Sequence, residues 1–155
     1  MLVEMALVTP FLLLLSGGVF EFSNILLTRL SIEAGIEDAA RYLARCTPSL
    51  SGGCITSAKN LAVTGTVDGS GAARVTNWTT SDITVSPSAP CTSASAYCIA
   101  TTDVNGTELY RSNSNYVTIV EVDGTYGYTG TGLWSYLGFG ALTLSASHQE
   151  RVFGS

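Results

Sequence analysis

The hydrophobic and polar positions divide the chain into an apolar N-terminal stretch and a longer mixed remainder. Residues 1–28 read MLVEMALVTPFLLLLSGGVFEFSNILLT, and no charge interrupts them between Glu4 and Glu21. A membrane-spanning helix needs about 17 to 25 apolar residues, so this stretch reaches the lower limit of a span. It predicts a helix that is apolar on all sides.

After Thr28 the pattern becomes amphipathic without a break. Apolar side chains recur at helical spacing, namely at Ile25, Ile32, Ile36, Ala39, Ala40 and Leu43. We therefore predict one continuous helix from about Leu2 to Arg45, about 65 Å long at the usual rise per residue. Pro10, Gly17 and Gly18 weaken this helix, because proline removes a backbone hydrogen bond and each glycine costs about 1 kcal/mol relative to alanine. We therefore predict local flexibility of the helix at these three positions.

The other side of the amphipathic half carries charged side chains spaced by four residues: Arg29, Glu33, Glu37, Arg41 and Arg45. Such residues follow one side of a helix, and the order Glu37 to Arg41 adds about 0.3 kcal/mol. Two interpretations remain open. The row is either a solvated face or a docking surface between identical subunits.

Beyond the long helix the sequence predicts a small antiparallel sheet. Thr47-Pro48 and residues 51–53 end the helix, and a short second helix follows. The predicted segments are a helix over 55–63 and strands over 82–86, 97–102, 107–111, 116–122 and 142–152, with turns at Asn105-Gly106 and Asp123-Gly124. The glycine- and aromatic-rich segment 124–140 is read as a packed cap over the sheet, or else as a contact surface.

This pattern predicts an α+β fold, in which the small antiparallel sheet covers the apolar face of the helix after residue 25. We expect an N-terminal hydrophobic half-helix over 1–28, buried in a membrane or filament core. A globular head over 29–155 includes the amphipathic half-helix 29–45. No positively charged leader precedes the apolar stretch, as expected if processing has removed it or if the sequence begins late.

Composition and charge narrow the range of functions that the sequence allows. The chain has 155 residues, a formal net charge of −5 and only 12% charged residues. Nucleic-acid binding is disfavoured because the sequence has no basic cluster. The residues after the apolar stretch are rich in Thr, Ser, Gly and Asn, which favours a location outside the cytosol.

Four cysteines fit an oxidising compartment. Four cysteines permit three connectivities, and we favour the two local pairs, Cys46–Cys54 and Cys91–Cys98. A zinc site is weakly supported, since the sole histidine, His148, is distant in sequence. Residues 103–106 lack the later acids of a calcium loop and predict a plain turn. No metal, cofactor or catalytic group is expected.

Glu4 is an acid near the start of an otherwise uncharged helix. In an apolar core an unpaired carboxylate costs several kcal/mol, so it needs a positive partner. The α-amino group at the start of an adjacent subunit is the natural candidate. Pairing of this kind fixes the axial register of each incoming subunit.

Several segments together resemble the TadE-like pilin family of tight-adherence (Flp-type) pilus systems. The resemblance is strongest over residues 3–45, at VEMALVTP (3–10), VFEF (19–22) and EDAARY (37–42), and weaker at AKNLAV (58–63) and LTLSAS (142–147). It implies a type IV pilin-like architecture and a prepilin that a dedicated peptidase cuts after a glycine. Such a protein waits in the inner membrane and is then built into a cell-surface filament with copies of itself or other pilins. Glu4 corresponds to the acid near the mature N-terminus of type IV pilins, one residue earlier here.

The resemblance favours a structural subunit of an attachment pilus. Residues expected to pack in the filament core are Leu7, Phe11, Leu12, Leu13, Leu14, Leu15, Phe20 and Phe22. The alternative is a single-pass membrane anchor that carries a monomeric extracytoplasmic binding module, which gives no reason for Glu4. An enzyme is disfavoured because no serine or cysteine has a recognisable nucleophile context.

Overall fold

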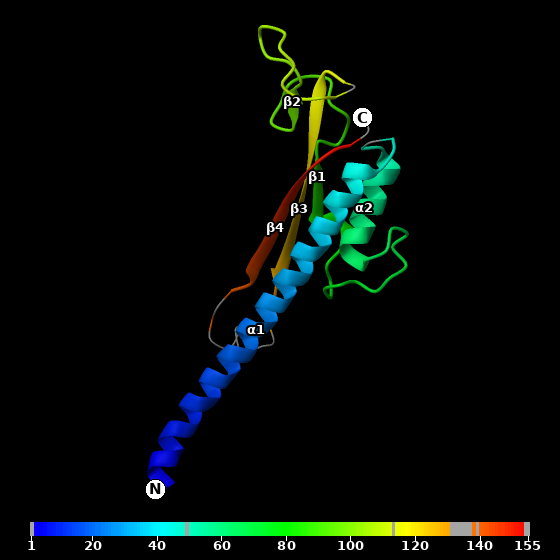
Figure 1. Ribbon diagram of the computed structural model, residues 1–155. Coiled ribbons are helices and arrows are strands. Elements are labelled where there is room, and N and C mark those ends of the chain that lie inside the picture. Colours follow the sequence, from blue (N-terminus) through cyan, green and yellow to red (C-terminus); the bar gives the residue numbers. More distant parts are fainter. Residues whose placement is uncertain (1, 49, 113, 131–137, 139, 154–155) are drawn as a thin grey trace.

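The computed structural model describes residues 2–48, 50–112, 114–130, 138 and 140–153. Along these residues the elements are α1 (Leu2–Arg45), α2 (Gly52–Thr64), η1 (Thr80–Asp82), β1 (Ile83–Ser86), β2 (Cys98–Ala100), β3 (Tyr116–Tyr128) and β4 (Leu142–Arg151). The long apolar helix and the small antiparallel sheet confirm the predicted α+β class. Figure 1 shows the N-terminal half of α1 projecting from the head that the other elements form.

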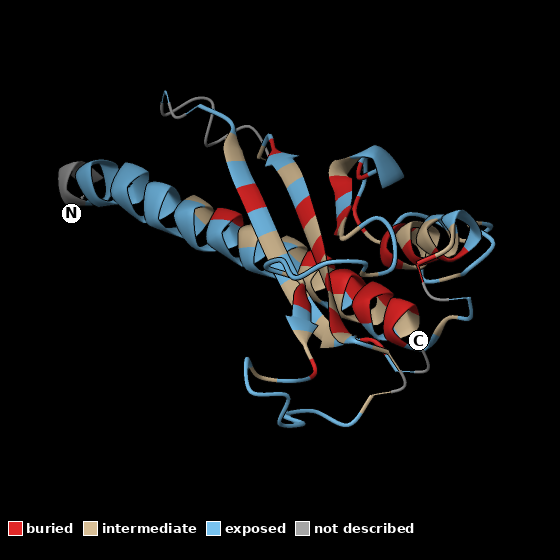
Figure 2. Ribbon diagram, turned by 90° about the horizontal axis from the view of Figure 1, so that it is seen from above, coloured by how far each residue is buried: buried red, intermediate tan, exposed pale blue. Residues whose placement is uncertain are grey.

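The continuous helix predicted from Leu2 to Arg45 is confirmed as α1. Its amphipathic half is the spine of the head, because the predicted core positions Ile32, Ile36, Ala39, Ala40 and Leu43 are all buried. Ile25 is partly buried against the same core. Figure 2 shows the buried residues gathered on this half, whereas the projecting half is exposed.

β3 is the central strand of the sheet. β4 runs antiparallel to it, from the pair Ile119 and Arg151 to the pair Tyr128 and Leu142. β1 and β2 pair antiparallel with separate parts of β3. Alternation gives the sheet two different faces. Val120, Val122 and Leu144 are buried in the core beside α1, while Thr125, Ser145 and Ser147 on the other face are exposed.

The helices and the sheet meet around Trp78. Its side chain is buried, and its indole N–H donates to the carbonyl oxygen of Thr125 at 3.2 Å. Two glycines permit the close approach of the elements around it. A Cβ added at Gly35 of α1 would lie 2.4 Å from the carbonyl oxygen of Ala62 in α2, and one at Gly124 would lie 2.6 Å from Cδ1 of Ile36.

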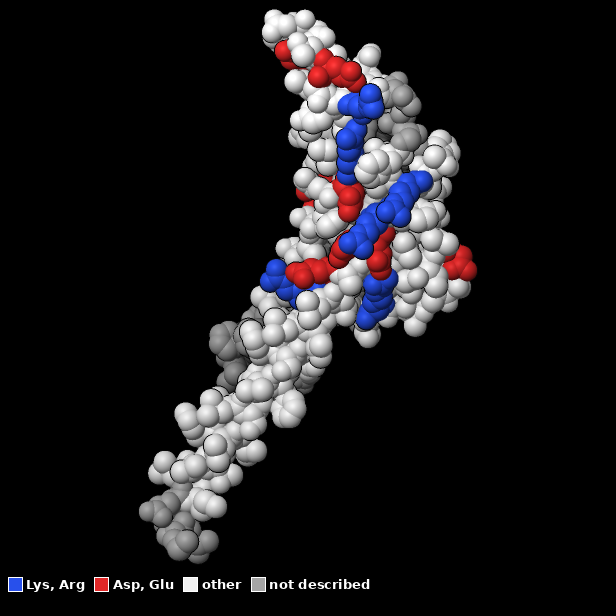
Figure 3. Space-filling view, viewed as in Figure 1, with Lys and Arg blue, Asp and Glu red and all other residues white. Residues whose placement is uncertain are grey.

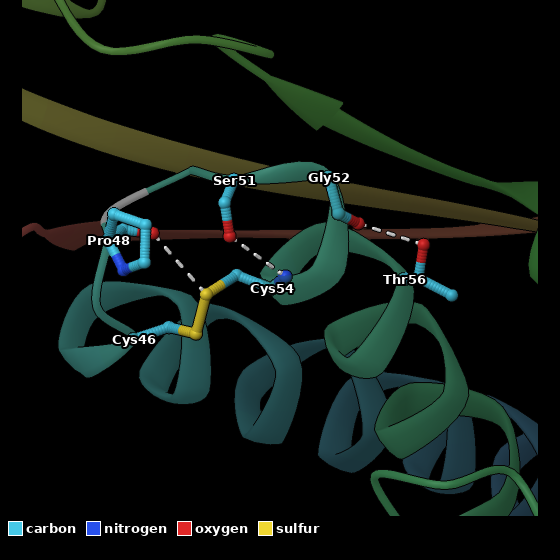
Figure 4. Close-up of a disulfide and its surroundings, with 6 residues drawn as sticks. All are labelled: Cys46, Pro48, Ser51, Gly52, Cys54 and Thr56. Carbon is cyan, nitrogen blue, oxygen red and sulfur yellow. Dashed lines mark hydrogen bonds between the residues drawn. A yellow bond between two sulfur atoms is a disulfide. The ribbon is translucent and has the colours of Figure 1, made fainter.

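A disulfide between Cys46 and Cys54 ties the end of α1 to the first turn of α2 (Figure 4). The hydroxyl oxygen of Ser51 caps α2 by accepting the backbone N–H of Cys54 at 3.3 Å. Gly65 ends α2 in the left-handed region with φ 75°. The second disulfide joins Cys91 to Cys98, the first residue of β2. These are the two local pairings favoured from the sequence.

Two details of the predicted sheet are wrong. The strand predicted to close at Asp123-Gly124 continues to Tyr128. Gly124 is not a turn residue, because its missing side chain makes room for Ile36 and Trp78 under the sheet. Residues 124–128 therefore belong to a strand and not to a cap. The remainder of the proposed cap falls largely on residues 131–137 and 139, outside the described residues.

The strand predicted over residues 107–111 does not form beyond one isolated bridge, between Thr102 and Glu108. The carbonyl oxygen of Thr101 accepts the N–H groups of both Leu109, at 2.7 Å, and Tyr110, at 3.2 Å, so the backbone curls where a strand would stay extended. The turn before this segment does form. The carboxylate of Asp103 accepts the N–H groups of Asn105 and Thr107, and these bonds, with Thr107 first, lower the pKa of Asp103.

Candidate assembly surface

The projecting half of α1 exposes apolar side chains on every side. Between Met5 and Phe20 every described residue is exposed except Gly17, which is half-buried; Leu7 retains 75% and Phe20 72% of its accessible surface. The residues predicted to pack in a filament core are in this segment or next to it, and all are exposed in the single chain: Leu7, Phe11, Leu12, Leu13, Leu14, Leu15, Phe20 and Phe22. This surface needs an apolar environment outside the chain.

Three hydroxyl side chains of this half are satisfied inside the helix. The hydroxyl groups of Thr9, Ser16 and Ser23 each donate to the carbonyl oxygen four residues earlier, at 2.6, 2.8 and 2.9 Å. A hydroxyl group bonded in this way has no need of water. The segment therefore fits a bilayer or a bundle of helices equally well, and by length and composition α1 is able to cross a membrane.

The helix runs without interruption through Pro10, Gly17 and Gly18. A Cβ at Gly18 would meet no atom within 4 Å, so the chain itself places no constraint there. The flexibility expected at these positions stays a prediction. Glu4 lies in the first turns of α1, and its side chain lies outside the part of the chain that the structure describes.

Along the described part of α1, Glu21 is the first fully buried residue, with only 1% of its surface exposed. Tyr128, at the end of β3, lies beside it. Burial and then the negative charge of Glu21 raise the pKa of the Tyr128 phenol. Sequence reasoning noted Glu21 only as the end of the uncharged stretch and missed its burial. The signal was an acid set directly between Phe20 and Phe22, where a solvated residue is unexpected.

Above Glu21 the side of α1 that faces away from the head stays apolar. Phe22, Leu26, Leu27 and Leu30, which we term the outer stripe, are all exposed, Leu30 at 59%. The apolar face from Met5 to Leu30 is about 38 Å long along the helix axis, whereas the hydrocarbon core of a bilayer is about 30 Å thick. The apolar surface of α1 is therefore longer than a membrane is thick.

The charged row continues the outer stripe toward the C-terminal end of α1. Arg29 binds Glu33 at 2.8 Å, Arg41 binds Glu37, and the guanidinium group of Arg41 also lies 4.0 Å from the carboxylate of Glu150 on β4. Figure 3 shows charged side chains gathered over this part of the molecule and an uncharged projecting half. The outward side of α1 thus changes from apolar to charged along its length.

His148 lies at the margin of the core, in phase with Leu142 and Leu144 along β4. It is half-buried on β4, and its Nε2 lies 3.3 Å from the carboxylate of Glu150. No group of three or more His, Cys, Asp or Glu that is able to hold a metal ion occurs among the described residues. The chemistry visible in the described part of the chain is that of packing and ion pairing.

Comparison with protein families identifies the N-terminal region. The family model described as TadE-like protein matches residues 1–41. Over these residues α1 is similar to the TadE-like family. The match confirms the family resemblance drawn from the sequence for residues 1–41. It ends inside α1, so the TadE-like region contains the apolar segment, the outer stripe and the beginning of the spine of the head. No curated protein and no solved structure matches the chain.

Proposed function

We propose that this protein is a pilin-like structural subunit of a Tad-like pilus, assembled through the TadE-like helix. It takes its place within an extracellular filament, or at the tip or base of one, that attaches the cell to surfaces. The observation that carries this proposal is the outer stripe, an exposed apolar face of α1 above the level at which the head begins.

The dimensions of α1 support association over simple anchoring. A bilayer that ends at the level of the buried Glu21 leaves Phe22, Leu26, Leu27 and Leu30 outside the hydrocarbon. Leaving four large apolar side chains in water costs about 1 kcal/mol or more for each. A second apolar helix covers them at no such cost. An anchor alone needs no apolar surface beyond the thickness of the membrane.

The same helix suits storage in a membrane before assembly. Lipid tails and neighbouring apolar helices are similar surroundings, so α1 exchanges one for the other with little change in solvation. Its internal hydroxyl bonds remain intact in both states. By family resemblance, the partners at this stage are the inner membrane, a prepilin peptidase and the pilus assembly machinery, followed by other copies or other pilins in the filament.

Glu4 has a separate role in this proposal. It is the one acid in the apolar half of α1 that precedes the head. Its carboxylate pairs with the α-amino group of an adjacent subunit, which selects one axial position among many equally apolar ones. The outer stripe supplies the affinity and Glu4 supplies the register.

The test is a pair of substitutions on the outer stripe, Leu27→Asn together with Leu30→Asn. Both side chains are exposed in the single chain, so the head should unfold at the same temperature as the wild type. Fibre yield in sheared cell-surface material, counted by electron microscopy, should fall sharply, as should the size of complexes in mild detergent. Val104→Asn is the matched control, because Val104 is fully exposed on a loop of the head.

Two results would contradict the proposed function. One is a normal fibre yield from the doubly substituted chain. The other is a wild-type chain that stays monomeric in membranes and in detergent at every concentration, as a membrane-anchored binding module would.

A further inference from the structure

The charged row on α1 is only partly satisfied within one chain. Arg29 pairs with Glu33 and Arg41 pairs with Glu37, whereas Arg45 makes no ion pair with any residue that the structure describes. The paired side chains keep between 40% and 59% of their surface exposed. Each of them is therefore open to a second partner of opposite charge.

Two hollows beside the row leave room for such partners. A groove of about 580 Å³ lies along Arg29, Glu33 and Glu37 and reaches His148 on β4. A separate recess of about 320 Å³ is lined by Arg41, Tyr42, Arg45 and Cys46. The acidic half of the row thus borders one hollow and the basic half borders the other.

The order of charges along the row allows one favourable alignment of two parallel helices. The order is positive, negative, negative, positive, positive. In exact register every charge would face its own copy and repel it. A displacement of about eight residues, which is roughly 12 Å, instead places Arg41 opposite Glu33, Arg45 opposite Glu37 and Glu37 opposite Arg29. Every charge that faces another in this alignment faces one of opposite sign.

The neighbouring displacements are not favourable. A displacement of about four residues sets Glu37 against Glu33 and Arg45 against Arg41. These two repulsive contacts cancel the two attractive contacts that the same displacement makes. A displacement of about twelve residues sets Arg41 against Arg29, which cancels the contact of Arg45 with Glu33. The charge pattern therefore selects one displacement among those that keep α1 helices parallel.

We propose that neighbouring copies of this chain pack their α1 helices in parallel with an axial displacement of about eight residues, or roughly 12 Å, fixed by ion pairs of Arg41 and Arg45 with Glu33 and Glu37 of the next copy. This inference rests on the proposed assembly function and specifies the contact between one pair of neighbouring copies. The pairing of Glu4 with an α-amino group needs a displacement of about three residues, so it is made with a different neighbour. The partner is a second copy, because the positive and negative halves of the row complement each other and no other molecule is needed.

The outer stripe agrees with the same displacement. Leu30 of one copy then faces Phe22 of the next, and Leu26 faces Gly18. Beyond the adjoining backbone of α1, no atom of the chain lies within 4 Å of a would-be Cβ at Gly18, so the neighbouring leucine is able to approach closely. Two positions eight residues apart on an α-helix also point in directions that differ by about 80°. Each copy therefore uses one side of α1 for the next copy and a different side for the previous copy. Contacts of this kind are heterologous and propagate into a helical filament.

Cysteine pairs measure the displacement directly. The four native cysteines are all in disulfides, so an introduced thiol reports only its own contacts. Full-length chains carrying Ala34→Cys are mixed in membranes with chains of different mass carrying Leu26→Cys, and the disulfide between copies is quantified. This pair should form severalfold more product than the mixture of Ala34→Cys with Leu30→Cys, which tests the displacement of four residues. It should also exceed the homodimer of Ala34→Cys.

Charge exchange tests the ion pairs. Arg45→Glu should weaken self-association about two- to fivefold at low ionic strength, the range of exposed ion pairs. Mixing these chains with chains carrying Glu37→Arg should restore it, since the two exchanged charges then face each other across the copies with opposite sign. The control is Arg111→Glu, the same charge change on an exposed residue away from α1, which should have no effect.

The outcomes separate this inference from the proposed function. If the wild type forms complexes but the Ala34→Cys and Leu26→Cys pair gives no more product than the alternatives, the displacement is wrong and the assembly function stands. An effect of Arg45→Glu no larger than that of Arg111→Glu overturns the ion pairs. A wild-type chain that never associates overturns both.

Discussion

Alanine in place of Gly35 tests the close approach of α1 and α2, which positions the head on its helix. A Cβ at this position would lie 2.4 Å from the carbonyl oxygen of Ala62 and 3.2 Å from Cη2 of Trp78. An ordinary carbon–oxygen contact is roughly 3.3 Å, so the two helices must separate by close to 1 Å. The oxygen belongs to the backbone of α2, which the disulfide and the buried Ala58 and Ala62 hold in place.

The expected cost follows from two opposing effects. Alanine gains about 1 kcal/mol of helix propensity over glycine. Overpacking of a well-filled core costs about 1 to 3 kcal/mol, and a backbone contact that no rotamer change relieves lies at the upper end of that range. The net loss is therefore about 2 kcal/mol, which lowers the midpoint of thermal unfolding by roughly 4 to 8 °C for a chain of this size.

The measurement is thermal unfolding of the full chain in detergent micelles, followed by near-ultraviolet circular dichroism, to which the buried Trp78 contributes. Gly18→Ala is the matched control, since it is the same substitution in the same helix at a site with no atom within 4 Å. It should leave the unfolding of the head unchanged. A Gly35→Ala chain that unfolds at or above the wild-type temperature would refute the close approach.

Three further predictions concern register, the disulfide and pH. Glu4→Ala should reduce fibre yield and leave the unfolding temperature of the head unchanged; a normal yield would remove its register role. Replacing Cys46 and Cys54 by serine opens a short loop and should lower the free energy of unfolding by about 2.5 kcal/mol in guanidinium titrations, whereas an unchanged midpoint would exclude a stabilising role for the bridge. Burial, and then the charge of Glu121, raise the pKa of Asp123 in the folded chain. Folding therefore favours its protonated form, and this contribution to stability falls as pH rises from the usual aspartate range through the raised pKa. Asp123→Asn should remove that fall and stabilise the head at neutral pH, and identical pH profiles of unfolding temperature for variant and wild type would contradict the assignment.

The fold was predictable wherever one periodic pattern governed a long segment. α1 follows from uninterrupted helical spacing over its whole length, and β4 from alternation over most of its length. Short segments with competing local signals were less predictable. Asp123-Gly124 has the composition of a turn, but the pairing of β3 with β4 continues beyond it, and Ile36 fills the space next to Gly124. Residues 107–111 have strand composition, but the doubly bonded carbonyl of Thr101 curls them away from the ladder.

The sequence by itself determined the apolar segment, the position of Glu4, the charged row and the TadE-like character of the N-terminal region, because each depends only on the order of residues along one helix. Only the tertiary structure decided which of those surfaces the chain covers for itself. It buries Glu21 and leaves Leu26, Leu27 and Leu30 exposed, although all four are neighbours in sequence. The physical reason is that burial depends on where the sheet and α2 pack around α1, and contacts distant in sequence, such as Gly35 with Ala62 and Tyr128 beside Glu21, set that position.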